Sequence, residues 1–349
     1  MPKKQYHTIR DIARIAGVTP GTVSRALHNS PLVNIDTKKR ILRIADELNY
    51  TPNLVARRLS TGKTFAIGVI VPFFTRPSVS ERLDGVVSVL SNSHYDLVIH
   101  NVETTEQREA GFRDVLRRER IDGALILSMP ILEADVDLLA QANIPVVMVD
   151  TKHPDLPLFD CVTVDDVDGG YKATKHLINL GHSKIGFISD VTERLFAPRS
   201  DNGYQFTSSR DRYTGYRKAM EEAGIPVREE YFAKEQHGFR EARGLAAQML
   251  ALEDPPTAIF ASNDTQAFGV IQAARGKGLS VPEDLSVVGY DDVQAAEFME
   301  LTTVRQMLFE SGRQGVEILM EKINGKTNDP KHTIIPTEII VRKSTASPK

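Results

Sequence analysis

The first sixty residues place apolar side chains at helical spacing in two short segments. Thr8, followed three residues later by Asp11, has the pattern of a capping box that begins a helix, and Gly17 is a typical residue to end one. Thr19 then caps a second helix, whose first turn accommodates Pro20. Each helix has one apolar face: Ile9, Ile12, Ala13 and Ala16 in the first, and Val23, Ala26 and Leu27 in the second. This pattern predicts a helix-turn-helix.

The outer face of the second helix suits a DNA groove. In a helix-turn-helix the second helix enters the major groove, where its outward side chains meet base edges. Arg25 carries the side chain best suited to bind a guanine through two hydrogen bonds. A third helix is expected to begin at Asp36 or Thr37, with basic side chains that face phosphates. The outward residues of the second helix are Pro20, Gly21, Thr22, Ser24, Arg25 and His28.

A short helix is expected after Pro52, which interrupts the chain. About two helical turns fit between Asn53 and Leu59, and a helix this short is marginal on its own in water. We therefore expect it to form only when something packs against it. Arg57 and Leu59 suit a minor-groove wedge, with the arginine on the backbone or groove and the leucine between base steps.

From Phe65 onward the pattern changes to short β-branched runs that alternate with helical stretches. Near-continuous apolar strands between helices are typical of parallel sheets covered on both faces. Roughly 280 residues are more than one domain built on a single sheet usually contains, which favours two doubly wound α/β lobes. The runs lie at 66–71, 96–99, 124–127, 146–149, 185–188, 258–261 and 286–289, with a last strand at 338–341.

Polar residues follow several of these strands. Asp150 follows the run at 146–149, Asn263 comes shortly after 258–261, and Asp291 follows 286–289. Ligands of such sheets bind beyond the carboxyl ends of the strands. Acidic residues there can also serve only as helix N-caps, but three clusters at one edge favour a polar ligand site between the lobes.

Composition and charge narrow the class of protein. The single cysteine, Cys161, permits no internal disulfide and argues against a zinc cluster. No export signal and no apolar run of about 18 residues is present, so we expect a cytoplasmic protein that does not enter a membrane. Residues 1–63 carry a net charge of +8 and the remainder −11. A basic head on an acidic body is the expected pattern of a DNA-binding module joined to another domain.

Longer motifs resemble the lactose-repressor (LacI/GalR) family of bacterial transcriptional regulators. The resemblance covers the chain from Thr8 to about Arg342. The motifs are Thr22-Val23-Ser24-Arg25-Ala26-Leu27, Leu48-Asn49-Tyr50-Thr51-Pro52-Asn53 with Ala56 and Leu59, His176-Leu177-x-x-Leu180-Gly181-His182, Ala261-Ser262-Asn263-Asp264, Ser286-Val287-Val288-Gly289-Tyr290-Asp291-Asp292, and Leu301-Thr302-Thr303-Val304.

This resemblance implies an all-α helix-turn-helix head on an α/β body of two doubly wound parallel-sheet lobes, similar to type I periplasmic binding proteins. It implies a homodimer on pseudo-palindromic double-stranded operator DNA. The DNA-binding residues implied are Thr8, Thr19, Pro20, Gly21, Thr22, Ser24, Arg25, His28, Asn53, Ala56, Arg57 and Leu59. Expected boundaries are 1–52 for the head, 53–64 for the hinge helix and linker, 65–161 with 293–323 for the first lobe, and 162–292 with 324–343 for the second.

The resemblance also implies an effector between the lobes, contacted by Asp150, Arg212, Asn263 and Asp291. Carboxylates accept hydrogen bonds from sugar hydroxyls, arginine and asparagine donate hydrogen bonds to them, and an aromatic ring can stack on the face of a sugar. Many family members carry Asn-Pro-Phe-Phe where this chain reads Arg76-Pro77-Ser78-Val79, and residues 191–209 form an extended segment that could act as a lid. The further candidates for effector contact are Phe73, Phe74, Ser78 and Phe206.

The sequence therefore predicts an allosteric repressor that senses a small polar effector, with a sugar as the first hypothesis. A regulator of the same family that senses a nucleobase or a protein corepressor remains an alternative. An enzyme, or a sugar-binding transport protein, with a basic appendage is a weaker one, because no nucleophile, cofactor loop or export signal is present. No cofactor and no metal site is expected, and Asp165 and Asp166 fit a helix start better than a calcium loop. With no C-terminal heptad extension before Lys349, a dimer is favoured over a tetramer.

Overall fold

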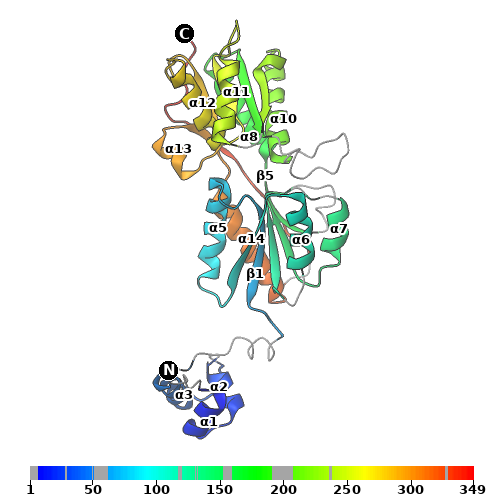
Figure 1. The fold of residues 1–349 in the computed structure, drawn as a ribbon, viewed down its shortest axis with the longest axis vertical. Coiled ribbons are helices and arrows are strands. Elements are labelled where there is room, and N and C mark those ends of the chain that lie inside the picture. The colour runs from blue at the N-terminus through cyan, green and yellow to red at the C-terminus, as the bar shows by residue number, and fades with distance from the viewer. Residues whose placement is uncertain are drawn as a thin grey trace. The chain divides into compact units, whose positions relative to one another are not determined.

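The computed structural model describes residues 7–27, 30–48, 50, 62–116, 120–129, 131, 133–151, 159–190, 207–235, 238–326 and 329–349. The chain divides into two compact units, a helical head (Met1–Lys63) and a larger α/β body (Thr64–Lys349) (Figure 1). Within the described ranges, no helix is both long and apolar enough to cross a bilayer.

The head contains three helices: α1 (Ile9–Ala16), α2 (Pro20–Leu27) and α3 (Ile35–Glu47). Thr8 begins α1 as predicted, because its backbone N–H and its hydroxyl both donate to the Asp11 carboxylate at 2.9 Å. Gly17 ends the helix in the left-handed conformation, with φ 61°. The Thr19 hydroxyl accepts a hydrogen bond from the Thr22 amide at 3.2 Å and so caps α2. The predicted helix-turn-helix is confirmed.

The third helix begins slightly earlier than predicted. Its N-cap is Asn34, whose side-chain oxygen accepts a hydrogen bond from the Asp36 amide at 2.9 Å, so Asp36 lies inside the helix. Ile41, Ile44 and Ala45 bury the inner face of α3 against α1 and α2. One small apolar core thus holds all three helices together.

The first lobe of the body is a six-stranded parallel sheet in the order β11-β5-β4-β3-β1-β2. Its strands are β1 (Ala66–Pro72), β2 (Asp96–Val102), β3 (Gly123–Leu127), β4 (Val146–Val149), β5 (Asp160–Val164) and β11 (His332–Ile335). Helices α5 (Pro77–Leu90) and α14 (Leu308–Ile323) cover one face, and α6 (Thr105–Val115) and α7 (Glu133–Ala140) cover the other (Figure 1). The inner strands β1, β3, β4 and β5 are buried on both faces, which explains their continuous apolar runs, whereas the edge strands β2 and β11 are largely exposed.

The second lobe repeats this architecture in the order β12-β10-β9-β8-β6-β7, with only β12 antiparallel. Its strands are β6 (Ile185–Asp190), β7 (Phe232–Glu235), β8 (Ala258–Ala261), β9 (Ser286–Asp291), β10 (Thr302–Arg305) and β12 (Glu338–Ile340). Helices α8 (Asp166–Asn179) and α10 (Thr207–Glu222) pack on one face, and α11 (Phe239–Met249), α12 (Asp264–Gly276) and α13 (Gln294–Phe298) on the other; a short 3₁₀ turn, η2 (Glu229–Tyr231), precedes β7.

Each sheet reverses its winding direction at its first strand. In the first lobe β1 lies between β2 and β3, and in the second β6 lies between β7 and β8. Such a switch point leaves a crevice at the carboxyl ends of the strands, which is where ligands of doubly wound sheets bind.

The chain crosses between the lobes at places other than those predicted. The range 293–323 was expected in the first lobe, but β10 pairs with β9 and Ala296 of α13 lies in the second-lobe core. The range 324–343 was expected in the second lobe, but β11 pairs with β5. The rest of both ranges agrees with the prediction, because α14 packs in the first-lobe core and β12 pairs with β10 of the second lobe. The first crossing follows β5, four residues after the expected boundary at 161. The local pattern of a short strand is compatible with either sheet. Its lobe is therefore determined by the strand with which its backbone pairs.

The eight expected strands are present, and four more are not among the expected runs: β5, β7, β10 and β11. β7, β10 and β11 are each four residues long and mix polar with apolar side chains. Thr64, expected in the linker, belongs to the body, because its amide donates to Asp122 Oδ1 at 2.7 Å. Cys161 is buried in β5, as a small apolar residue would be.

Candidate functional site

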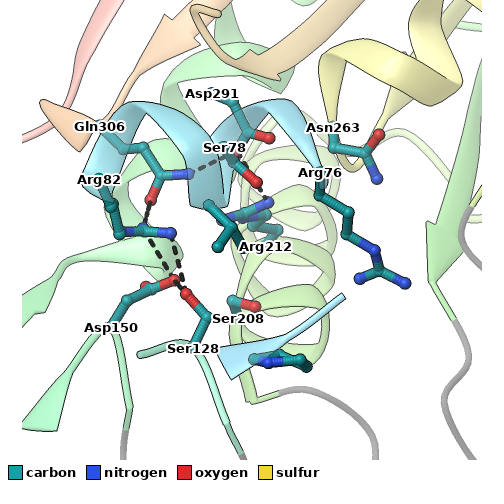
Figure 2. Close-up of a pocket in the computed structure, with 12 residues that line it drawn as sticks. Arg76, Ser78, Arg82, Ser128, Asp150, Ser208, Arg212, Asn263, Asp291 and Gln306 are labelled. Carbon is teal, nitrogen blue, oxygen red and sulfur yellow. Dashed lines mark hydrogen bonds and ion pairs between the residues drawn. The ribbon is translucent and has the colours of Figure 1, made fainter. Parts of the chain in front are cut away.

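A polar cleft lies between the lobes at the carboxyl ends of their strands (Figure 2). It has an empty volume of about 440 Å³. Polar or charged side chains make up nearly all of its lining, with Pro72 and Val79 as the apolar exceptions: Arg76, Ser78, Arg82, Ser128, Asp150, Ser208, Arg212, Asn263, Asp291 and Gln306.

The first-lobe half of the cleft is organised around Arg82, which is 1% exposed. Its guanidinium forms an ion pair with Asp150 Oδ2 at 2.8 Å and donates to the Ser128 hydroxyl at 2.9 Å and the Ser311 hydroxyl at 3.1 Å. The Ser128 hydroxyl in turn donates to Asp150 at 2.9 Å. A buried charge needs such complete pairing, so these contacts fix the direction of the Asp150 carboxylate.

The second-lobe half is organised around Arg212, which is 5% exposed. Its Nε donates to Asp166 Oδ1 at 2.9 Å and its Nη1 to the carbonyl of Ser262 at 2.6 Å. Asp291 lies 3.6 Å from Nη1, and the guanidinium stacks on the Tyr290 ring with its carbon 3.7 Å from the ring centre. Stacking on Tyr290 and the hydrogen bonds to Asp166 and Ser262 therefore hold the Arg212 guanidinium in one orientation.

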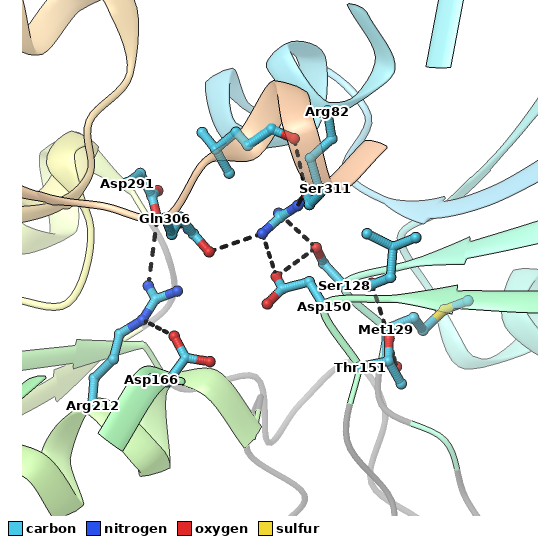
Figure 3. A network of polar contacts seen from close by, with 12 residues as sticks. Arg82, Ser128, Met129, Asp150, Thr151, Asp166, Arg212, Asp291, Gln306 and Ser311 are labelled. Carbon is cyan, nitrogen blue, oxygen red and sulfur yellow. Dashed lines mark hydrogen bonds and ion pairs between the residues drawn. The ribbon is translucent and has the colours of Figure 1, made fainter. Parts of the chain in front are cut away.

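Gln306 joins the two halves (Figure 3). It lies directly after β10, on the second crossing between lobes. Its side-chain oxygen accepts a hydrogen bond from Arg82 Nη2 at 2.9 Å, and its Nε2 donates to Asp291 Oδ1. A continuous polar chain thus runs from Asp150 through Arg82 and Gln306 to Asp291 and Arg212.

Backbone strain collects at the strand ends that line the cleft. Ser128, Asp150 and Asp291 have φ values of 48°, 55° and 113°, in a region that side chains other than glycine rarely adopt. Phe73, directly after β1, has φ 49°. Such conformations persist only where the surroundings impose them, and they are typical of ligand sites.

Close helix packing sets the positions of both arginines. Where α5 crosses α14, a Cβ at Gly85 would collide with the Phe309 carbonyl, and one at Gly312 would collide with the Arg82 backbone. Where α8 crosses α10, a Cβ at Gly170 would collide with the Arg212 backbone. The glycines let the helix backbones touch, and the arginines project into the cleft from these contacts.

Burial shifts the ionisation of several groups beside the cleft. Burial opposes the charge of Arg212, but Asp166, Tyr290 and Asp291 outweigh it, so its pKa lies above the ordinary value. Burial, reinforced by Asp291, raises the pKa of Asp264 well above the usual range. Asp264 accepts a hydrogen bond from the Val293 amide at 2.9 Å and one from the Thr303 hydroxyl at 2.5 Å, so it connects three strand ends of the second lobe.

The structure brings five of the predicted effector residues to the cleft: Ser78, Asp150, Arg212, Asn263 and Asp291. Phe73 and Phe74 do not line it. The Phe73 ring lies under the Arg76 guanidinium, 4.1 Å from its carbon. The Phe74 side chain is exposed, and its backbone amide donates a hydrogen bond to Asn101 Oδ1 at 2.9 Å. A contact of either ring with an effector therefore stays a prediction. Phe206 lies outside the described residues.

Five polar lining residues were not predicted: Arg76, Arg82, Ser128, Ser208 and Gln306. Ser128 follows an expected strand, as Asp150 does. Arg82 falls at helical spacing among the apolar positions Val79, Leu83 and Val86, which marks a charged residue on the inner face of a helix. The other three carried no such signal, and Gln306 follows a strand that the sequence pattern misses.

The residues of α2 predicted to contact DNA are exposed or half-buried, and their contact with DNA stays a prediction. Pro20, Gly21 and Arg25 are exposed, and Thr22 and Ser24 are half-buried. Arg25 Nε donates to the Gly21 carbonyl at 3.2 Å, which holds the side chain along its own helix. The exposed Thr8 lies at the start of α1. His28, Asn53, Ala56, Arg57 and Leu59 lie outside the described residues.

Comparison with known proteins agrees with this architecture. Residues 8–53 match the family model "Bacterial regulatory proteins, lacI family", and residues 174–345 match "Periplasmic binding protein-like domain". The chain is 35% identical over 340 residues to the HTH-type transcriptional repressor PurR of Photobacterium profundum, covering 97% of this chain and 98% of the relative. It is 35% identical over 348 residues to PurR of Haemophilus influenzae, covering 97% and 99%.

Solved structures of regulators share the fold. The Lac repressor bound to ONPG in the repressed state has a TM-score of 0.82 at 26% identity, covering 98% of this chain and all of that one (100%). A complex of the transcriptional regulator CelR with cellobiose has a TM-score of 0.70 at 26% identity, covering 97% and 99%. The named relatives are regulators of transcription and not enzymes.

Proposed function

This chain belongs to the LacI family of bacterial regulatory proteins and is a DNA-binding transcriptional repressor, and we propose that a sugar-like effector controls it from the cleft. The observation that carries the proposal is the convergence of Asp150 from one lobe with Arg212, Asn263 and Asp291 from the other. Carboxylates accept hydrogen bonds from hydroxyl groups, and arginine and asparagine donate them. A compact molecule with several hydroxyls satisfies both kinds of group.

The lining favours a polyol over a nucleobase. Recognition of a planar base commonly uses an aromatic platform, and none of the described lining residues is aromatic. The related regulator in complex with cellobiose supports a sugar as the class of effector.

The proposed control is a shift between two lobe arrangements. An effector that contacts Asp150 and Arg212 together favours the lobe angle at which both contacts form. In a homodimer, that angle sets the spacing of the two hinge segments Asn53–Leu59, whose assignment rests on the sequence. The size of the effect is limited by the difference in effector affinity between the two arrangements.

The proposed DNA contacts combine the head and the hinge. Thr19, Pro20, Gly21, Thr22, Ser24 and Arg25 of the helix-turn-helix face the major groove of a pseudo-palindromic operator, with Thr8 and His28 beside them. Asn53, Ala56, Arg57 and Leu59 face the minor groove, where the leucine separates base steps.

The experiment uses the full chain and an operator selected from random double-stranded DNA. Operator affinity is measured by fluorescence anisotropy with sugars, sugar acids, sugar phosphates and purine bases added in turn. We expect one sugar-class compound to change operator affinity, Arg212→Ala to abolish that response while operator binding remains, and Leu59→Ala to weaken operator binding while effector affinity remains.

The matched control is Arg210→Ala, because Arg210 is exposed on the same helix and pairs with the neighbouring Asp211. It should behave as the unmodified protein does. A response that survives Arg212→Ala, or a response to purine bases alone, would contradict the proposed effector site or the proposed effector class, respectively.

A further inference from the structure

The chain enters the first lobe through three hydrogen bonds to one carboxylate, which we call the Asp122 clasp. Asp122 Oδ1 accepts hydrogen bonds from the Thr64 amide at 2.7 Å and from the Thr64 hydroxyl at 3.1 Å. Asp122 Oδ2 accepts one from the Phe65 amide at 2.9 Å. Thr64 is the first residue of the body and directly follows the unit that contains the head. The clasp therefore holds the body at the residue where the DNA-binding part of the chain ends.

The backbone at this entry is fixed in one direction. Phe65 has φ 54°, in the left-handed region, and its ring centre lies 5.7 Å from that of Tyr95. The Phe65 carbonyl accepts a hydrogen bond from the Asp96 amide at 2.9 Å. A residue other than glycine keeps such a φ only where its surroundings impose it, and the charged oxygens of Asp122 hold the amides on both sides of this bend. The clasp thus sets the direction from which the chain joins the sheet.

Two neighbouring strands connect the clasp to the effector cleft. β1 begins directly after Phe65 and ends at Pro72, which lines the cleft. β3 begins directly after Asp122 and is followed by Ser128, which also lines it. The two strands pair in parallel and are buried along their length. A strand of five residues spans about 17 Å, so the clasp and the cleft lie at opposite ends of one rigid unit. Movement of the first lobe at the cleft must therefore move the clasp with it.

We propose that Asp122 is the positioning residue that couples the first lobe to the DNA-binding head. By holding Thr64 and Phe65, it makes the linker leave the lobe from a fixed point and in a fixed direction, so the position of the lobe determines where the head can lie. This inference rests on the homodimer and the lobe movement proposed above, and it names the residue through which that movement reaches the DNA. Without the clasp, each head gains freedom that operator binding must remove.

The test compares the selected operator with a single half-site of the same sequence, using the full chain. A dimer whose two heads are held in place binds the complete site more tightly, because its second head binds as if at high local concentration. Fluorescence anisotropy gives both affinities, and their ratio is the readout. Asp122→Ala should lower this ratio by at least about 10-fold and leave half-site affinity nearly unchanged, because the freed residues of both protomers must be ordered again on the operator.

The matched control is Asp96→Ala, which removes the same charge from the same end of the sheet. Asp96 is exposed at the start of β2 and holds Phe65 through its backbone amide, which alanine retains. The ratio for this control should stay within about 2-fold of that for the unmodified protein. A second variant, Thr64→Val, keeps the shape of the side chain and removes one hydrogen bond of the clasp. It should lower the ratio by about 3-fold.

Hydrogen exchange measured by mass spectrometry reports on the clasp itself. The peptide that contains Thr64 and Phe65 should exchange faster in Asp122→Ala than in the unmodified protein, because its amides lose their acceptor. The buried strand β3 should stay protected, which establishes that the lobe is folded. If β3 loses its protection in Asp122→Ala, Thr64→Val decides by the same two readouts.

Two results would overturn the inference. One is an operator-to-half-site ratio that is unchanged although the Thr64–Phe65 peptide exchanges faster, which includes an equal loss of affinity for both DNAs. The other is slow exchange of this peptide in the variant, because Asp122 would then not hold it. An unmodified protein that binds the half-site as tightly as the complete operator would instead contradict the proposed homodimer, and the inference would fall with it.

Discussion

Arg82 of the first lobe donates a hydrogen bond to the side-chain oxygen of Gln306 at 2.9 Å (Figure 3). Through this contact, the ion pair of Arg82 with Asp150 in the first lobe is joined to that of Arg212 with Asp291 in the second. Gln306 is 1% exposed and lies on a chain crossing, so any change in lobe angle must alter this buried polar chain.

Replacement of Gln306 by methionine should destabilise the body. The variant keeps the side-chain volume but leaves Arg82 and Asp291 each without one buried partner, which costs about 1–3 kcal/mol for each group. Urea denaturation measures the free energy of unfolding. Gln272→Met, at an exposed position of α12, should stay within about 0.5 kcal/mol of the parent protein. Equal stability of the two variants would show that the bridge contributes nothing.

Gly85→Ala should destabilise the first lobe by at least about 2 kcal/mol, because the new methyl group collides with backbone atoms of α14 that cannot move independently. Gly244→Ala is the matched control on α11, where the added methyl group meets nothing within 4 Å. The control should gain about 0.5–1 kcal/mol from helix propensity. The prediction fails if the two alanine variants unfold at similar urea concentrations.

Stability should depend on pH through the histidines beneath the C-terminal segment. His182 contacts the Thr257 hydroxyl and the Ala346 carbonyl at 2.8 Å each, and His176 contacts the Thr345 hydroxyl at 2.9 Å. Burial lowers the pKa of both imidazoles below 6.5. As pH falls through 6.5 the unfolded chain takes up protons first, so the free energy of unfolding decreases from there downward until the folded histidines are also protonated.

The measurement is urea denaturation at a series of pH values from neutral to about pH 5. His182→Gln should flatten the dependence, whereas His94→Gln, at an exposed position, should leave it unchanged. A slope that survives His182→Gln in full would assign the effect to other groups.

Arg25→Ala should reduce the preference for the selected operator over random DNA, because the lost side chain is the longest base-reading donor on α2. A good two-point contact to a guanine contributes about 1–3 kcal/mol of discrimination. Competition anisotropy measures the ratio of the two affinities. Arg43→Ala, on the exposed face of α3, should instead weaken binding to both DNAs and reduce its salt dependence. If Arg25→Ala weakens both DNAs equally, Arg25 contacts phosphate and not a base.

Features that depend on neighbours along the chain could be predicted from the sequence. Caps, glycine stops and apolar spacing located the helix-turn-helix, since each is settled within one or two turns. The polar residues after buried strands located Asp150, Asn263 and Asp291, because parallel strands of a sheet end at a common edge. Motif resemblance added Arg212, which lies inside a helix and follows no strand.

The three-dimensional fold is needed to tell which lobe each late strand joins and which polar side chains of the cleft contact one another. β10 and β11 are both short strands of mixed polarity, but β10 pairs with β9, the strand directly before it, whereas β11 pairs with β5, which is far away in sequence. In the sequence, Arg82 is one charged residue within a predicted helix. Its burial against Ser311 and Asp150 follows only from the crossing of α5 with α14. Strand pairing and side-chain burial depend on residues that are distant in sequence. A local sequence pattern therefore identifies residues that can form this site, but it does not predict which of them contact one another.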